Sequence, residues 1–174
     1  MMLGKLIARV KPLTTRACWV RHWFTVASID GSFDQYLGDT YAPFQFNEIW
    51  GLGEVAFGLR DKIGFTSECF VRARNDTNVV IEYGCDDGAR LFVYDKDGNL
   101  VYSKTDSWMI QPYTIYRASF NLKRGVYKFV FDFYEWTAYG GVSFKLLSGD
   151  IKPVKNIRPL SKLPLSRTCL NPRY

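Results

Sequence analysis

Residues 125–135 read GVYKFVFDFYE, and this stretch decides the fold class. Tyr127, Phe129, Phe131 and Phe133 occupy every second position, with smaller or charged side chains between most of them. Successive side chains of an extended strand point to opposite faces, so this alternation predicts a strand with one aromatic face. We expect the four rings to be buried in the core.

The same period of two recurs along most of the chain. Turn sequences such as Asp86-Asp87-Gly88, Asp97-Gly98 and Gly140-Gly141 separate the alternating segments, and no amphipathic helix is evident. Many short strands at regular spacing predict an all-β protein, an antiparallel β-sandwich. The further strands are expected at residues 19–29, 54–59, 65–74, 79–85, 89–94, 100–103, 113–121 and 140–148.

The spacing also suggests one strand pairing. If residues 65–74 and 79–85 form a hairpin centred on residues 76–78, Cys69 and Cys85 face each other across it on the core side. The chain has four cysteines, no CxxC pair and one histidine, so a structural zinc site is not indicated. Buried free thiols are the alternative to a bond between these two cysteines.

Charge is divided by position along the chain. Residues 1–22 hold five basic residues and no acid, residues 23–150 hold 12 basic and 17 acidic residues, and residues 151–174 hold six basic residues and no acid. The sequence therefore predicts a mildly acidic body with two basic arms, which bears on partners rather than on fold. Solvated tails, docking on acidic neighbours and binding to nucleic acid are the alternatives.

The last segment is rich in proline, which breaks helices and central strands. Residues 149–174 are therefore expected to form an extended arm. With six basic residues and no acid beside the acidic body, residues 151–174 are expected to run across a neighbouring molecule. Residues 1–43 are expected to contribute a basic segment and the first strands, and residues 44–148 the core of the sandwich. The basic residues of the C-terminal arm are Lys152, Lys155, Arg158, Lys162, Arg167 and Arg173.

Three segments resemble the PA14 domain family. Residues 79–93, VVIEYGCDDGARLFV, resemble its signature, in which an alternating strand runs into Asp-Asp-Gly and a short strand follows. Residues 122–129, LKRGVYKF, resemble its Gly-x-Tyr strand, and residues 132–135 with 140–146 resemble its closing hairpin. The resemblance covers about residues 44–147 and implies a sandwich of the jelly-roll type.

The resemblance implies a binding site at Asp86 and Asp87. In some branches of the family a calcium ion sits on this pair, and two adjacent carboxylates suit such a hard cation. Trp136 and Tyr139, in the loop at residues 135–140, would stack on a glycan; this loop lacks the asparagine that completes the calcium shell in the sugar-binding branch. The residues alone also fit a turn in which Asp side chains bond backbone amides, with both rings in ordinary rim or interface packing.

An enzymatic function is not expected. The only histidine, His22, lies in a basic and apolar strand, where a core or interface role is favoured over a nucleophilic device. Asp86 and Asp87 are adjacent in sequence and cannot flank a glycosidic bond from opposite sides.

Three functions remain open. The first is a non-catalytic structural subunit of a larger surface assembly, such as a virion, coat or fibre, whose partners are other copies or other subunits. The second is a calcium-assisted, carbohydrate-binding module of the adhesin type. The third is association with nucleic acid through the basic arms, which the acidic body disfavours.

The expected location follows from two sequence features. No apolar run reaches the roughly 18 residues of a membrane span, and no signal peptide is recognised. We expect a place on an extracellular surface or a virion, with assembly in the cytoplasm before release.

Overall fold

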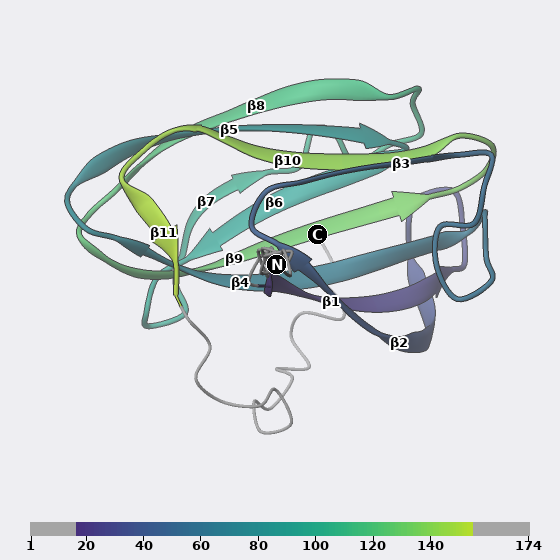
Figure 1. The fold of residues 1–174 in the computed structure, drawn as a ribbon, viewed down its shortest axis with the longest axis horizontal. Coiled ribbons are helices and arrows are strands. Elements are labelled where there is room, and N and C mark those ends of the chain that lie inside the picture. The colour runs from purple at the N-terminus through teal and green to yellow at the C-terminus, as the bar shows by residue number, and fades with distance from the viewer. Residues whose placement is uncertain (1–16, 155–174) are drawn as a thin grey trace, which may run out of the picture.

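The computed structural model describes residues 17–154, which form a sandwich of two antiparallel β-sheets (Figure 1). The large sheet has the strand order β2-β1-β4-β9-β6-β7, with β11 paired to β4, and the small sheet has the order β3-β10-β5-β8. This confirms the expected fold class. The strands are β1 (Ala17–Val26), β2 (Phe33–Pro43), β3 (Phe46–Gly51), β4 (Ile63–Ala73), β5 (Thr77–Asp86), β6 (Gly88–Tyr94), β7 (Leu100–Lys104), β8 (Thr114–Leu122), β9 (Gly125–Glu135), β10 (Gly140–Ser148) and β11 (Ile151–Pro153).

The aromatic face of β9 lies between the two sheets. Tyr127, Phe129, Phe131 and Phe133 are all buried, as the alternation predicts. Each buried ring of this kind is worth about 1.5–3 kcal/mol relative to an exposed one, so this strand is a main source of stability.

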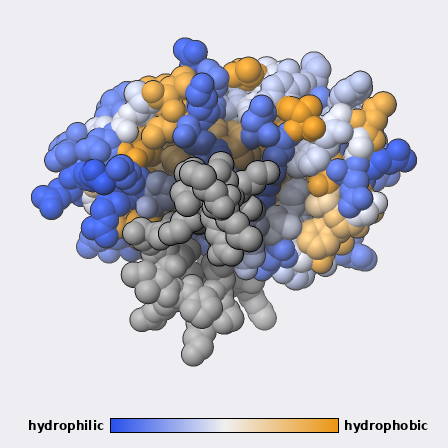
Figure 2. Space-filling view, viewed as in Figure 1, coloured by the Kyte–Doolittle hydropathy of each residue, from blue (hydrophilic) through white to orange (hydrophobic). Residues whose placement is uncertain are grey.

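The visible surface outside the core carries mostly hydrophilic residues, with smaller hydrophobic areas among them (Figure 2).

The predicted hairpin between residues 65–74 and 79–85 does not form. β4 pairs with β1 and β9 in the large sheet, whereas β5 pairs with β10 and β8 in the small sheet. Cys69 and Cys85 therefore lie on different sheets, and the predicted pairing of these two cysteines is wrong. The turn at residues 74–76 carries the chain from one sheet to the other instead of folding it back on a neighbour.

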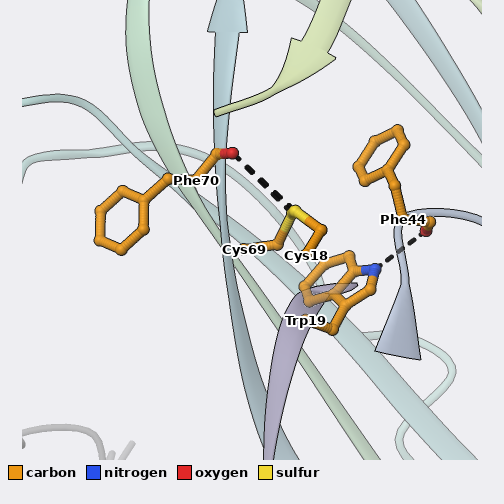
Figure 3. Close-up of a disulfide and its surroundings, with 5 residues drawn as sticks. All are labelled: Cys18, Trp19, Phe44, Cys69 and Phe70. Atoms are coloured by element: carbon orange, nitrogen blue, oxygen red, sulfur yellow. Dashed lines mark hydrogen bonds between the residues drawn. A yellow bond between two sulfur atoms is a disulfide. The ribbon is translucent and has the colours of Figure 1, made fainter. Parts of the chain in front are cut away.

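Cys69 forms a disulfide with Cys18 (Figure 3). Cys85 is a buried free thiol. The two bonded residues lie on the neighbouring strands β1 and β4, with their Cα atoms 5.2 Å apart. Beside the bond, the indole nitrogen of Trp19 donates to the carbonyl oxygen of Phe44 at 2.9 Å. The disulfide thus fixes the first strand of the described chain to the centre of the large sheet.

Three strands were not predicted, β11 among them, and one predicted strand does not form. β2 and β3 lie in a stretch to which the sequence assigns no strand. Residues 54–59, expected as a strand, form a turn with a single bridge between Ala56 and Leu59.

The first residues of the expected C-terminal arm are part of the sandwich, where they form β11. Ile151 is buried, and β11 pairs with Val71–Ala73 of β4, so this part packs on its own body. The rest of the proposed arm after Val154, like the first 16 residues, lies outside the described part of the chain. The boundaries expected at residues 43 and 148 fall at the ends of β2 and β10.

Candidate functional site

Three strand ends meet at one end of the sandwich, at the right of Figure 1. β5 ends at Asp86 in the small sheet, the chain crosses at Asp87, and β6 starts at Gly88 in the large sheet. β9 ends beside them at Glu135. The Asp-Asp pair therefore bridges the two sheets and does not form a simple hairpin turn; the peptide between the two residues is cis.

Asp87 is buried and connects two loops that are far apart in sequence. One carboxylate oxygen accepts the backbone N–H of Trp136 at 2.7 Å, and the other accepts that of Gln111 at 3.1 Å. The Gln111 side chain donates to the backbone oxygen of Asp87 at 3.1 Å. Burial raises the pKa of the Asp87 carboxyl, and these backbone donors oppose the rise.

Glu135 is a carboxylate in the position of a core residue. Its side chain is fully buried, and neither of its oxygens has a hydrogen-bond partner. Desolvation, followed by the nearby charges of Asp87, Asp86 and Asp61, raises its pKa to about 9. A buried polar group without a partner is costly, so this side chain calls for an explanation.

Asp86 completes the cluster. Its burial, with the neighbouring charge of Asp87, raises its pKa to about 6, and a hydrogen bond from the backbone N–H of Tyr113 opposes the rise. One oxygen from each of Asp86, Asp87 and Glu135 lies within 4.8 Å of the others. We call these three residues the carboxylate cluster.

The carboxylate cluster suits a cation. Three carboxylates this close repel one another when all are ionised, which is the condition that a divalent ion relieves. Calcium takes six to eight oxygen ligands and accepts carboxylates in one- or two-oxygen contacts. The two unpartnered oxygens of Glu135 supply a third carboxylate, where the sequence offered only Asp86 and Asp87 and lacked an asparagine.

The two predicted stacking residues lie in the loop that Asp87 holds. Trp136 is half-buried, and the ammonium nitrogen of Lys62 lies 4.9 Å from its ring centroid. Tyr139 is 60% exposed, and its ring lies over Gly51 at the end of β3. The structure thus brings this loop to the carboxylate cluster by the backbone of Trp136, and leaves the Tyr139 ring open to solvent.

Sequence reasoning missed two residues of this site. Glu135 was assigned only to its strand, although a carboxylate that continues the run of core-facing positions 129, 131 and 133 is a readable signal. Gln111 carried no signal, because its position beside Asp87 depends on the path of the loop between β7 and β8.

Lys152, the basic arm residue that the structure describes, is not part of this site. Lys152 lies on β11, paired with Arg72 of β4, away from the three strand ends. The expectation that the arm binds other copies, other subunits or nucleic acid stays a prediction from sequence. Its remaining residues lie outside the described part of the chain: Lys155, Arg158, Lys162, Arg167 and Arg173.

From Ala17 to Val154, the structure has no helix long and apolar enough to cross a membrane.

Comparison with protein families finds no matching family, and comparison with curated proteins finds no relative. Among solved structures, the chain is similar to part of the GH31 alpha-xylosidase from Xanthomonas citri, at 12% identity and a TM-score of 0.46, over 72% of this chain and 13% of that one. It is similar to part of a beta-glucosidase from Kluyveromyces marxianus, at 9% identity and a TM-score of 0.46, over 79% of this chain and 16% of that one. It is also similar to a family 35 carbohydrate binding module from an environmental isolate, at 12% identity and a TM-score of 0.38, over 76% of this chain and 96% of that one. These similarities are too distant to assign a function, and the chain spans less than a fifth of either enzyme.

Proposed function

We propose that this chain is a non-catalytic carbohydrate-binding module that holds a calcium ion at Asp86, Asp87 and Glu135. The observation that carries the proposal is Glu135, fully buried, with neither oxygen bonded, and within 4.8 Å of two other carboxylates. A cation removes both the repulsion within the cluster and the unsatisfied state of the Glu135 oxygens.

The carbohydrate part of the proposal is supported by the surroundings of the cluster. When bound, calcium supplies a positive centre that vicinal sugar hydroxyls can ligate. Tyr139 offers an exposed ring in the loop that Asp87 anchors, next to Gly51. Exposed apolar residues adjoin these anchors in sequence: Leu52 follows Gly51, and Met109 and Ile110 precede Gln111, which also bonds Asp87. An aromatic ring beside a polar anchor suits a sugar, which has one apolar face and a rim of hydroxyls.

A non-catalytic role is supported by the contacts of His22 and Asp87, whose side chains are hydrogen-bonded within the protein. The Nδ1 atom of His22 is hydrogen-bonded to the Asp39 carboxylate at 2.6 Å, on the β1–β2 pair of strands. Each oxygen of Asp87 accepts one backbone N–H, which fixes the carboxylate in place and leaves a lone pair on each oxygen for a cation. The disulfide between Cys18 and Cys69 supports a place in an oxidising compartment, such as an extracellular surface, where such bonds persist.

Calorimetric titration with calcium chloride, followed by a glycan array with and without EDTA, tests the proposal. The wild type should bind about one calcium ion, and sugar binding should disappear in EDTA. Asp86→Asn should weaken both, because it removes a ligand oxygen without removing the backbone contacts of Asp87. Tyr139→Ala should weaken sugar binding and leave calcium binding unchanged.

The matched control is Asp97→Asn, which removes a carboxylate from the exposed turn between β6 and β7. It should bind calcium and sugar as the wild type does. A wild type that takes up no calcium, or an Asp86→Asn variant that binds it equally well, would leave Asp86-Asp87-Gly88 as a structural crossover alone.

A further inference from the structure

A groove of about 530 Å³ lies on the outer face of the small sheet, next to the carboxylate cluster. The small sheet is uppermost in Figure 1, and Figure 2 shows hydrophobic residues set among hydrophilic ones along the same upper edge. The residues of the groove that matter here are Asn47, Glu82, Tyr113, Ile115, Ser143 and Lys145.

Strand register places the groove in line with the cluster. In the β10–β5 pair, Gly141 lies opposite Asp86, Ser143 opposite Gly84, and Lys145 opposite Glu82. The residues between them, such as Val142 and Tyr83, are buried, so the named positions face outward. From Asp86 to Glu82 the strand advances about 13 Å, which is long enough for more than one sugar ring.

The strands β3 and β8, which flank the β10–β5 pair, form two different walls of the groove. Asn47 of β3 lies opposite Ser143, and Ile115 of β8 lies opposite Gly84. Asn47 is exposed and polar, whereas Ile115 is 59% exposed and apolar. The groove therefore offers hydrogen-bonding groups along one side and an aliphatic surface along the other.

Tyr113 links the groove to the cluster. Its backbone N–H bonds the Asp86 carboxylate, and its hydroxyl bonds the Ser143 hydroxyl at 2.7 Å. The ring lies over Gly84 and Gly141, where a Cβ on either residue would crowd it. The two glycines thus let the Tyr113 ring, 38% exposed, lie close against the strands at the point where the groove meets the cluster.

We infer that the ligand is an oligosaccharide, with one sugar at the carboxylate cluster and the following sugars in this groove. The inference rests on the proposed function and extends it from a single sugar to a chain. A glycan alternates apolar ring faces with hydroxyl groups, which matches the Tyr113 and Ile115 surfaces beside Asn47, Ser143 and Lys145. The groove is built on four paired strands, so little chain order is lost when a ligand binds.

The test compares a groove variant with a matched control. Asn47→Ala combined with Ile115→Ala removes one polar and one apolar side chain, both exposed, from the groove. Ser119→Ala combined with Leu147→Ala makes the same kinds of change outside the residues that line the groove. Affinities are measured in calcium for gluco-, manno- and xylo-oligosaccharides of one to four sugars, with calcium affinity and native mass as further readouts.

The wild type and the control should bind a chain of three sugars at least about tenfold more tightly than the single sugar, the equivalent of one well-placed contact. The groove variant should bind calcium and the single sugar normally and lose this gain. Binding that does not grow with chain length, or a groove variant that keeps the gain, overturns the inference and leaves the proposed function standing. If no sugar of any length binds, both fail; if only the groove variant changes native mass, the groove is an interface between copies and the inference is wrong.

Discussion

Glu135 is a single residue that lowers the stability of the fold that contains it. It continues the core-facing row of Phe131 and Phe133 along β9, yet it carries a carboxyl group with no hydrogen-bond partner. An apolar residue at this position would make the folded protein more stable, because no polar group would be buried without a partner. Residues that lower stability in this way cluster at functional sites. This is the physical reason for proposing the calcium site at Glu135.

Without calcium, the free energy of unfolding should fall as the pH rises from about 4.5 to about 9. Glu135 has an ordinary pKa of 4.5 in the unfolded chain and about 9 in the folded chain. Between these values the folded chain binds more protons than the unfolded chain, so stability decreases with rising pH. Glu135→Gln should remove most of this slope and raise the melting temperature at pH 8, as thermal unfolding in EDTA would show.

The control is Glu68→Gln, which removes a carboxylate from the outer face of the same sheet and should show the wild-type slope. Added calcium should raise the wild-type melting temperature more at pH 8 than at pH 5, because the carboxylates must lose protons to ligate the ion. A Glu135→Gln variant with the same pH slope as the wild type would mean that this carboxyl is not buried in solution.

Arg21 is a second buried charge, and its partner lies on the other sheet. Its guanidinium lies 4.4 Å from the ring centroid of Phe46 and 4.7 Å from that of Phe65, and pairs with Glu48 at 2.6 Å. Burial lowers its pKa, and Glu48 opposes this shift. The pair connects β1 to β3 through the edge of the core.

Glu48→Ala should destabilise the protein by about 3 kcal/mol, because it leaves a buried cation without its counter-charge. Combining it with Arg21→Met should restore most of the loss, since an apolar residue of similar length fills the same space. Urea unfolding of the two variants checks this. Equal losses in the single and the double variant would show that packing, and not charge, holds this position.

At the scale of elements, most strands predicted from sequence have a buried aromatic or aliphatic face; the exposed strand β7, which follows the Asp97-Gly98 turn, is the exception. β9 and β5 were predicted because their core-facing residues alternate strictly. β2 was missed because it is an edge strand of the large sheet and is mostly exposed. Gly38 and aspartates also interrupt the alternation of apolar and polar residues in its sequence. An edge strand that buries as little as β2 leaves only a weak period-two signature in its sequence.

Pairing between strands was less predictable than the strands themselves. A tight turn such as Asn75-Asp76 is compatible with a hairpin and with a crossover between sheets, and only the whole core decides between them. The same limit applies to the site. The pair Asp86 and Asp87 is readable from sequence, whereas Gln111 reaches Asp87 only through the folded path of its loop.

The disulfide belongs to this scale, because it joins two neighbouring strands. Cys18→Ser should lower the free energy of unfolding by about 4 kcal/mol, the value expected for a closed loop of 51 residues. Denaturant unfolding with and without reductant measures the loss, and reductant should affect only the wild type. Non-reducing peptide mapping should link Cys18 to Cys69; a link between Cys69 and Cys85 would contradict the strand arrangement.

At the scale of the whole molecule, the carboxylate cluster lies at the seam of the sandwich. Asp86 belongs to the small sheet and Glu135 to the large sheet, and Asp87 lies in the crossing between them. A ligand that binds only the folded state stabilises it by mass action. Calcium bound here would therefore hold the two sheets together and prepare the sugar site in the same event.

Truncation separates the sandwich from the proposed arm. A chain that ends after Val154 keeps β11, in which Ile151 is buried and the N–H of Val154 donates to the carbonyl oxygen of Phe70 at 2.8 Å. A chain that ends after Asp150 loses these contacts. Burial of Ile151 is worth about 1.5–3 kcal/mol, so the shorter chain should melt several degrees lower, at about 2–4 °C per kcal/mol for a domain of this size. Both should still bind calcium.

Comparing the full chain with the chain that ends at Val154 tests whether the basic residues after Val154 drive assembly. Five of the six basic residues of the C-terminal segment lie beyond this point, whereas residues 23–150 carry a net negative charge. If the segment binds the acidic body of a neighbour, the full chain should have a higher native mass than the chain ending at Val154. Raised salt should lower that mass, because exposed charges are screened within about 10 Å at 0.1 M ionic strength. Equal native masses for the two chains, at low salt and high concentration, would show that the C-terminal segment does not assemble this protein.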